Sequence, residues 1–400
     1  MFIGMQIDPV GQSSAALQGL WFVLIGVLWV GFFFLEGFDF GVGMLIPFLG
    51  GKSDEKRRVM VNAVGPTWDG NEVWLLTAGG ATFAAFPTWY ATLFSVLYLP
   101  LFLVLVGLIA RGISFEYRSM NPSTKWRNSF DWTNSIGSFI VALVLGVGFA
   151  NFVRGVPVNT IGDFSHRFFG LFNGYGLLGG VMLVVLFLAH GAQFLSIKTM
   201  DEVGVSARKA ADILTPVAAV LMAVFVIWGT GMYAGDNPFN SGWGTPVRWI
   251  VGIVSVVALV AATLFGRMKR PGLAFVGTGL AIATWVIQVW ATIYGTLGIG
   301  VQANCDDVTQ GCSLFFQKIS FGAWSGAEGL YGGASPMSMY ASSELTLGLM
   351  RTFAFIMVPI VLAYIIWAYH VFRKRLSTTN IPVSEKPVKA PAGASRALAE

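Results

Sequence analysis

Two stretches decide the fold: GFFFLEGFDFGVGML at Gly31–Leu45 and GPTWDGNEVWLLTAGGATFAAFP at Gly65–Pro87. Both are apolar enough to contribute to membrane-spanning helices, yet both contain acids. The acids are Glu36, Asp39, Asp69 and Glu72. An acidic side chain at bilayer depth is costly unless it is paired or hydrated. These residues therefore indicate a proton or ion path, or a polar site that binds a partner.

The composition places the whole chain in a membrane. Of its 400 residues, 55% are hydrophobic and 11% are charged, and the mean hydropathy is +0.69. A soluble protein of this length could not bury so much apolar surface. We therefore predict an all-α integral membrane protein, since helices satisfy their own backbone hydrogen bonds in lipid. The net charge of +5 comes from basic residues that flank helices and indicates no nucleic-acid partner.

Runs of about 20 apolar residues predict nine spans. Their approximate limits are 17–48, 59–87, 89–110, 129–153, 171–197, 210–233, 247–266, 272–297 and 347–371. Of the 25 Lys and Arg residues, 20 lie on one side of this pattern, including the tail after the last span. The positive-inside rule then places the N-terminus outside and the C-terminus inside. Spans one to four and five to eight would form two four-helix bundles, with the ninth helix peripheral.

The predicted membrane domain covers residues 1–375 and includes a long outer loop at 298–346. Cys305 and Cys312, the only cysteines, lie in this loop. Because the outer side is oxidising, we expect a disulfide between them; two unpaired thiols are the alternative. Residues 376–400 have the composition of a disordered cytoplasmic tail.

The acids are predicted to lie in the cytoplasmic half of the bilayer. Glu36 and Asp39 are three residues apart and share a helix face, beside the G-x-x-x-G step of Gly37 and Gly41. Asp39 is roughly 15 Å of helical rise from the inner loop, and Asp69 is about 27 Å from the next outer turn. This depth suits groups that collect protons from the cytoplasm.

We predict a proton path at Asp69, Asp39 and Glu36. The alternative is structural: acids paired inside the bundle with an arginine at the same level, such as Arg57, Arg58 or Arg111. The balance favours function for Asp69, is even for Asp39, and favours structure for Glu36 and Glu72.

A second set of charges lies near the inner surface and is interpreted as structural. Arg111, Arg118, Glu116 and Asp131 are predicted to form an interfacial network that anchors helices. His190 lies within the fifth predicted span, but one isolated histidine is weak support for haem ligation. We predict no catalytic residue and no metal site on this chain.

Several strings go beyond general physical patterns. They are GFDFGVGML (Gly37–Leu45), RRVMVNAVGPTWDGNEVWLLTAGGATFAAFP (Arg57–Pro87), ARGISFEYR (Ala110–Arg118), KWRNSFDW (Lys125–Trp132), GFANFVRGVP (Gly148–Pro157) and SSELTL (Ser342–Leu347). Together they resemble subunit II of the cytochrome bd quinol oxidase family. The resemblance is dense over about residues 20–157 and returns near the last span, and WDGNEVWL is its most specific string.

The resemblance implies an enzyme complex of the bacterial plasma membrane that oxidises quinol and reduces O₂ to water. Its b-type and d-type haems, or b-type in place of d, would lie in a haem-bearing subunit I, so this chain is expected to bind no haem. Subunit II would have the same nine spans and pack against subunit I. The resemblance leaves open a structural quinone in this chain and small single-span subunits, beside the membrane lipids.

The resemblance also suggests roles for single residues. Trp68, Asp69, Gly70 and Asn71 match the family's W-D-G-N string, whose aspartate lines a proton path from the cytoplasm. Asp69 thus takes the role of relay by resemblance. Asp39 matches the aspartate of a G-F-D string, for which a place near the path and a role in helix packing both stay open.

We therefore predict a subunit that stabilises subunit I and contributes to proton delivery without redox chemistry of its own. A proton-coupled secondary transporter is the alternative. Such proteins use broken helices around a solute site, whereas no proline interrupts Gly37–Gly43 and no convergent polar set is visible. A purely structural scaffold is the other alternative.

Overall fold

The computed structural model describes residues 13–154, 168–232, 244–295 and 341–380. Within these ranges the chain is helical, apart from one isolated bridge between Thr199 and Leu376. The α-helices are α1 (Ala15–Gly50), α2 (Asp54–Val64), α3 (Trp68–Ala85), α4 (Pro87–Val96), α5 (Tyr98–Tyr117), α6 (Thr124–Arg154), α7 (Gly174–Lys198), α8 (Asp201–Gly231), α9 (Gly244–Arg267), α10 (Pro271–Gly295) and α13 (Glu344–Val371). The short 3-10 helices η1 (Phe168–Leu171) and η4 (Thr378–Asn380) complete the described elements.

The described residues contain eight helices that are long and apolar enough to cross a membrane. They are α1, α5, α6, α7, α8, α9, α10 and α13. The prediction of a multi-pass all-α protein is confirmed. The two cysteines of the predicted disulfide, Cys305 and Cys312, lie outside the described residues.

Two predicted spans are each divided into two helices. The segment 59–87 becomes α2 and α3, separated by a turn in which the Thr67 amide bonds the Val64 carbonyl at 2.9 Å. Pro66 explains the break, because proline lacks an amide hydrogen and restricts the preceding residue. The segment 89–110 becomes α4 and α5, with the break at Leu97. The polar start of α3 keeps it outside the eight apolar spans.

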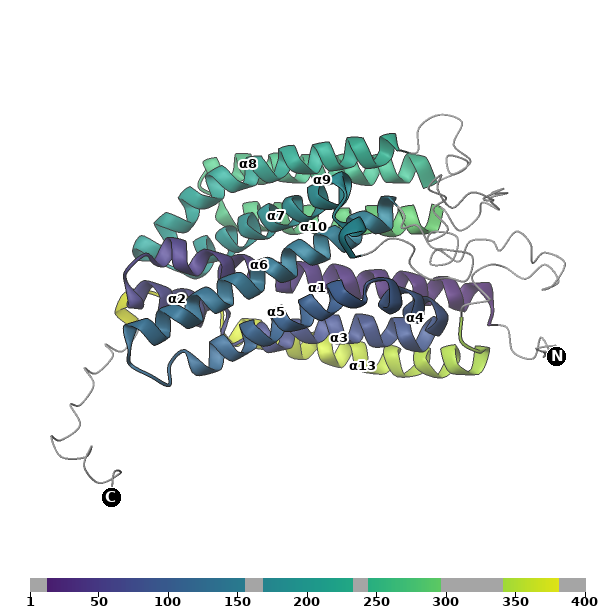
Figure 1. The fold of residues 1–400 in the computed structure, drawn as a ribbon, viewed down its shortest axis with the longest axis horizontal. Helices are drawn as coiled ribbons and strands as arrows, with labels where there is room; N and C mark the ends of the chain where they lie inside the picture. Colours follow the sequence, from purple (N-terminus) through teal and green to yellow (C-terminus); the bar gives the residue numbers. More distant parts are fainter. Residues whose placement is uncertain (1–12, 155–167, 233–243, 296–340, 381–400) are drawn as a thin grey trace, which may run out of the picture.

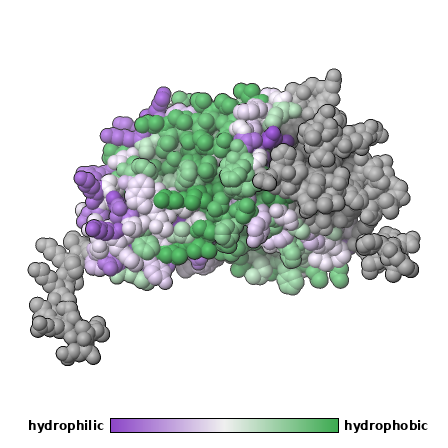
Figure 2. All heavy atoms as spheres, in the orientation of Figure 1, coloured by the Kyte–Doolittle hydropathy of each residue, from purple (hydrophilic) through white to green (hydrophobic). Residues whose placement is uncertain are grey.

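The long helices run roughly along one axis, with α7 to α10 grouped on one side of α1 and with α3, α5 and α13 on the other (Figure 1). Helix α1 contacts α2, α3, α6, α7, α10 and α13, so it lies at the centre of the bundle. In Figure 2 the visible face is hydrophobic along its middle and hydrophilic at the end where α2 lies. This pattern fits a bilayer around the middle and water at the α2 end.

Helices α1 and α7 cross in backbone contact. A Cβ atom placed on Gly41 would clash with the Phe187 carbonyl oxygen and lie 2.9 Å from the Gly191 nitrogen. A Cβ atom on Gly191 would lie 2.7 Å from the Gly41 Cα. Only glycine fits at either position. This crossing lets α1 approach α7 while its acids face α3 and α5.

Helix α13 lies along the edge of the bundle and is fixed mainly at its ends. The N-terminal end of α13 is held by Ser342, whose amide bonds the Ala85 carbonyl at 2.9 Å. At its C-terminal end, the Leu376 amide bonds the Lys198 carbonyl, and the Met200 amide bonds the Leu376 carbonyl, both at 2.8 Å. Leu376, the first residue of the predicted disordered tail, thus contacts the α7–α8 turn, and η4 after it contacts α2. Residues 381–400 are outside the described ranges.

The α1–α7 crossing leads to a prediction. Gly41→Ala should force the helices apart and cost about 1–3 kcal/mol, as overpacking does in other tightly packed cores. The measurement is thermal unfolding and yield of the purified complex. Gly19→Ala is the matched control, because a Cβ atom on Gly19, also in α1, meets nothing within 4 Å. Equal stability of the two variants would contradict the assigned crossing.

Candidate functional site: a buried cluster of three acids and one arginine

Three acids surround one guanidinium inside the bundle. Arg111 Nη1 lies 3.1 Å from Glu36 Oε2 and 3.9 Å from Glu72 Oε2, and Arg111 Nη2 lies 3.8 Å from Asp39 Oδ2. Glu36, Asp39 and Arg111 are fully buried, and the Glu72 side chain is 21% exposed. The cluster joins α1, α3 and α5 and holds more negative than positive groups.

Aromatic rings enclose the guanidinium. The Arg111 Cζ atom lies 4.9 Å from the ring centre of Phe40, 5.3 Å from that of Phe115 and 5.8 Å from that of Trp68. Trp68 and Phe115 also stack on each other at 5.1 Å. A cation over these ring faces gains electrostatic attraction while the rings exclude water. The pocket therefore stabilises the arginine and limits access of solvent to the acids.

Several buried polar atoms in the cluster have no hydrogen-bond partner among the residues that the structure describes. They include both carboxylate oxygens of Glu36, Oδ1 of Asp39 and the guanidinium nitrogens of Arg111. The 3.1 Å contact between Arg111 and Glu36 has the distance of an ion pair but not the alignment of a hydrogen bond. Buried polar groups are almost always hydrogen-bonded in native proteins. This set is therefore unusual and marks a candidate functional site.

Asn71 and Tyr369 extend the cluster toward α13. Asn71 Nδ2 donates a hydrogen bond to Asp39 Oδ2 at 2.7 Å, and the Tyr369 hydroxyl donates to Asn71 Oδ1 at 2.8 Å. Neither residue was among the predicted site residues. Asn71 could have been found from helical spacing, because it lies three residues after Trp68. No local sequence pattern could have identified Tyr369, because 298 residues separate it from Asn71.

The residues of the W-D-G-N-E string form the first turn of α3 and lie on different faces of that helix. Trp68, Asn71 and Glu72, at spacings of three and four, lie on the face toward Arg111. Asp69 lies off this face and is exposed on the chain. The structure therefore brings Glu36 and Asp39 of the predicted path together, with Glu72 beside them, and places Asp69 outside the buried cluster.

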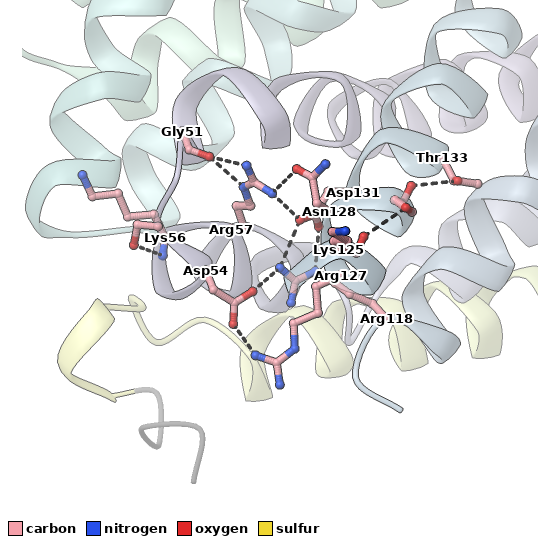
Figure 3. A network of polar contacts seen from close by, with 12 residues as sticks. Gly51, Asp54, Lys56, Arg57, Arg118, Lys125, Arg127, Asn128, Asp131 and Thr133 are labelled. Atoms are coloured by element: carbon pink, nitrogen blue, oxygen red, sulfur yellow. Dashed lines mark hydrogen bonds and ion pairs between the residues drawn. The ribbon is translucent and has the colours of Figure 1, made fainter. Parts of the chain in front are cut away.

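A second charge cluster lies at the α2 end (Figure 3). Asp131 accepts hydrogen bonds from Arg118 Nε at 2.6 Å and from Arg57 Nη1 at 3.1 Å. Asp54 accepts from Arg118 Nη2 and from Arg127 Nη1, both at 2.7 Å. These arginine–aspartate contacts connect α2 to the ends of α5 and α6 and so hold the three helices together.

The predicted interfacial network is divided by the structure. Arg118 and Asp131 pair directly, with Asp54, Arg57 and Arg127 as further members that were not predicted in it. Arg111 belongs instead to the buried acid cluster. Glu116 is exposed and has no ion pair among the described residues. The physical reason is depth, because Arg111 precedes the end of α5 by nearly two turns and cannot reach the network there.

His190 is a packed core residue. Its Nδ1 lies 2.7 Å from Thr278 Oγ1 and its Nε2 lies 3.1 Å from the Phe34 carbonyl. Its ring stacks on Phe275 with centroids 4.4 Å apart. Both ring nitrogens are thus engaged by the protein. Among the residues that the structure describes, no group of three or more His, Cys, Asp or Glu side chains is arranged to hold a metal ion.

Comparisons with known proteins agree on one family. Residues 17–372 match the family model described as "Cytochrome bd terminal oxidase subunit II". Cytochrome bd ubiquinol oxidase subunit 2 of Bacillus subtilis is 35% identical, over 91% of this chain and 98% of the relative. Cytochrome bd-I ubiquinol oxidase subunit 2 of Escherichia coli K12 is also 35% identical, over 91% and 96%. The fold resembles a solved chain of the bd oxidase from Geobacillus thermodenitrificans, with a TM-score of 0.54 at 17% identity, over 68% of this chain and 84% of that one.

The arginine is expected to be essential for stability. Arg111→Met should destabilise the protein by about 3–5 kcal/mol, because it leaves buried acids without a counter-charge. The double variant Arg111→Met with Glu36→Gln should recover part of this loss, since one buried charge is then removed. Thermal unfolding of the detergent-solubilised complex measures both. A double variant no more stable than Arg111→Met would argue against the pairing.

The α2-end cluster predicts a pH dependence. Burial alone would raise the pKa of Asp54, but the guanidinium groups of Arg118 and Arg127 outweigh it and hold the pKa below its ordinary value of 3.8. A lowered pKa means that the stabilisation is complete above the ordinary value and is lost as the pH falls through the lowered one. Asp54→Asn should cost on the order of 1 kcal/mol at neutral pH after solvent screening.

Thermal unfolding of the native chain and of Asp54→Asn, measured from pH 7 downward, tests this dependence. We expect the difference in unfolding temperature to stay constant down to the ordinary aspartate range and to vanish below it. A difference that shrinks already between pH 7 and pH 5 would contradict the lowered pKa of Asp54.

Proposed function

Because this chain belongs to the cytochrome bd terminal oxidase subunit II family, we propose that it is the haem-free partner of a haem-bearing subunit I in a membrane-bound quinol oxidase. Its tasks are to stabilise that subunit and to help deliver protons from the cytoplasm for the reduction of O₂ to water. The haems of the partner supply the redox chemistry. The residues of this chain hold and pass protons.

The proposed topology has nine spans, with the N-terminus outside and the C-terminus inside. The eight apolar helices of the described residues are joined by α3, whose 18 residues rise about 27 Å. In its polar first turn, Asn71 is buried and Glu72 is partly covered beside Arg111, whereas Asp69 is exposed. The two proposed bundles share α1 and α7 as neighbours, and α13 is the peripheral helix.

The observation that carries the proton path is the group of three acids around one buried guanidinium. If all were ionised, the cluster would hold two uncompensated negative charges in a low-dielectric interior, which is strongly unfavourable. Such a cluster therefore retains at least one proton and can exchange it between carboxylates. A purely structural pairing would need one acid for one arginine.

A route from the surface is built into α3. Asp69 is exposed, Glu72 one turn later is partly exposed, and Glu36 and Asp39 are fully buried beside it. Carboxylates in this order lead from the exterior of the chain to the buried cluster. The cluster's polar atoms without protein partners are groups that internal water usually bonds. We propose that Asp69 acts at the entrance and that Glu72 connects it to Glu36 and Asp39.

Family membership favours the oxidase over a secondary transporter. Helix α1 also continues without interruption from Ala15 to Gly50 through both buried acids, whereas transporter sites are formed by broken helices. A structural scaffold remains the competing account of the acids, and substitution distinguishes it from the relay.

In the assembled complex, Asp39→Asn or Glu36→Gln should lower steady-state O₂ consumption by about tenfold or more, because loss of a proton-transferring group typically costs 10²–10⁴ in rate. Asp69→Asn and Glu72→Gln should also reduce steady-state O₂ consumption. The measurement is quinol-driven O₂ uptake, normalised to the haem content of the complex purified through this chain.

Glu55→Gln serves as the control, because it also replaces a carboxylate by an amide, at an exposed position on α2 outside the cluster. Retained haem content with reduced O₂ uptake supports the relay. Full uptake in both Asp39→Asn and Asp69→Asn would refute it. Loss of subunit I from every cluster variant, with Glu55→Gln intact, would assign the acids to assembly.

A further inference from the structure

We propose that the Tyr369 hydroxyl is a positioning group: it fixes the orientation of the Asn71 amide and thereby ensures that Asp39 receives a hydrogen-bond donor. The inference rests on the proposed role of Asp39 in proton delivery and adds a residue from the last helix to it.

Three groups from three helices form a continuous chain. The Tyr369 hydroxyl on α13 donates to Asn71 Oδ1 on α3 at 2.8 Å, and Asn71 Nδ2 donates to Asp39 Oδ2 on α1 at 2.7 Å. Asn71 is only 2% exposed and Asp39 is fully buried. Because no bulk solvent reaches the amide, the Tyr369 hydroxyl and the Asp39 carboxyl determine whether the nitrogen or the oxygen of the Asn71 amide faces Asp39.

The amide group of asparagine has nearly the same shape in its two flipped orientations, but its oxygen only accepts and its nitrogen only donates. In the observed orientation the nitrogen faces Asp39, which suits an ionised carboxylate. In the flipped orientation the carbonyl oxygen would face Asp39, and only a protonated carboxyl could bond it. In the observed orientation the Tyr369 hydroxyl donates to Asn71 Oδ1, whereas in the flipped one it would have to accept from Nδ2 and direct its own proton elsewhere, so the observed donation favours the first orientation. Tyr369 thus biases Asp39 toward the form that can accept a proton.

Other charged groups also act on Asp39, so the effect of Tyr369 is one of several. Glu36 lies on the same helix, Glu72 on α3 and Arg111 on α5. Among the described groups near Asp39, Tyr369 is the one contributed by α13. Substituting it leaves the three acids and the arginine chemically unchanged, which makes the hydroxyl separable from the rest.

The fold holds Tyr369 at this point. Along α13 only Leu347 is buried, so the helix has little core of its own. Its inner end is fixed by the backbone bonds of Leu376 with Lys198 and Met200, and Arg375 donates to the Thr199 carbonyl at 2.7 Å. These contacts lie less than two helical turns beyond Tyr369. The segment after α13 therefore sets where the hydroxyl stands.

A packing role for Tyr369 is the competing account. Its ring meets that of Phe38 edge-on at 6.5 Å and packs against the core near α2 and α7. Tyr369→Phe keeps the ring and removes only the hydroxyl, so packing should persist. Tyr364→Phe is the matched control, because Tyr364 lies on the same helix and is 63% exposed.

The experiment uses the whole oxidase complex, with Tyr369→Phe, Tyr364→Phe and Asp39→Asn compared with the native chain. Infrared difference spectra recorded over a pH titration report the carboxyl band of Asp39, identified by its loss in Asp39→Asn. We expect this band to shift in frequency and in titration midpoint in Tyr369→Phe and not in Tyr364→Phe. O₂ uptake per haem should fall about fivefold, as for the loss of one buried hydrogen bond.

An unchanged Asp39 band in an assembled Tyr369→Phe complex would overturn the inference. Failure of the proposed function looks different: Asp39→Asn would then respire at the native rate while the band still shifts in Tyr369→Phe. If Tyr369→Phe does not assemble, a fluorinated tyrosine placed at position 369 alone keeps the hydroxyl and makes it a stronger donor. A shift of the Asp39 band in that complex supports the inference, and an unshifted band contradicts it.

Discussion

The structure depends on the burial of more acid than base at one point in a membrane protein. Glu36, Asp39 and Glu72 share the guanidinium of Arg111, which three aromatic rings enclose. Burying one ion pair is already costly, and an excess of carboxylates is tolerable only if protons or water compensate it. Four helical segments must then converge where no single one could shield these charges. Residues of α1, α3, α5 and α13 meet at this cluster.

Close helix packing makes the convergence possible. Because Gly41 and Gly191 allow backbone contact between α1 and α7, the opposite face of α1 is free to direct Glu36 and Asp39 toward Arg111. At the α2 end, fully paired charges such as Arg118 with Asp131 lock the helix termini. The two clusters thus differ in kind: at the α2 end two acids are paired with three arginines, whereas in the buried cluster three acids share one arginine.

Helix α13 links the far end of the chain to this site. It is an apolar helix in which Leu347 is the one buried residue. Its one polar contribution to the acid cluster is the hydroxyl of Tyr369, which reaches Asn71. The contacts of residues after α13 with the α7–α8 turn give the end of the chain a role in the geometry of a site built from its first third.

The sequence by itself determined the class of the protein and most spans, and it singled out the acids, because hydropathy and the cost of buried charge are local properties. The sequence-based prediction missed the break between α2 and α3, although Pro66 indicates it, and the break at Leu97 between α4 and α5 has no such signal in its apolar run. The prediction grouped Arg111 with Arg118, although it also named Arg111 among three arginines that could pair with the acids, and it ranked Asp69 above Glu72. Only the tertiary structure decided that Arg111 joins the acids, that Asn71 and Glu72 face inward while Asp69 does not, and that Tyr369 completes the set. The physical reason is that a helix's rotation and depth are fixed by its neighbours, and those neighbours lie from about 30 to almost 300 residues apart in the chain.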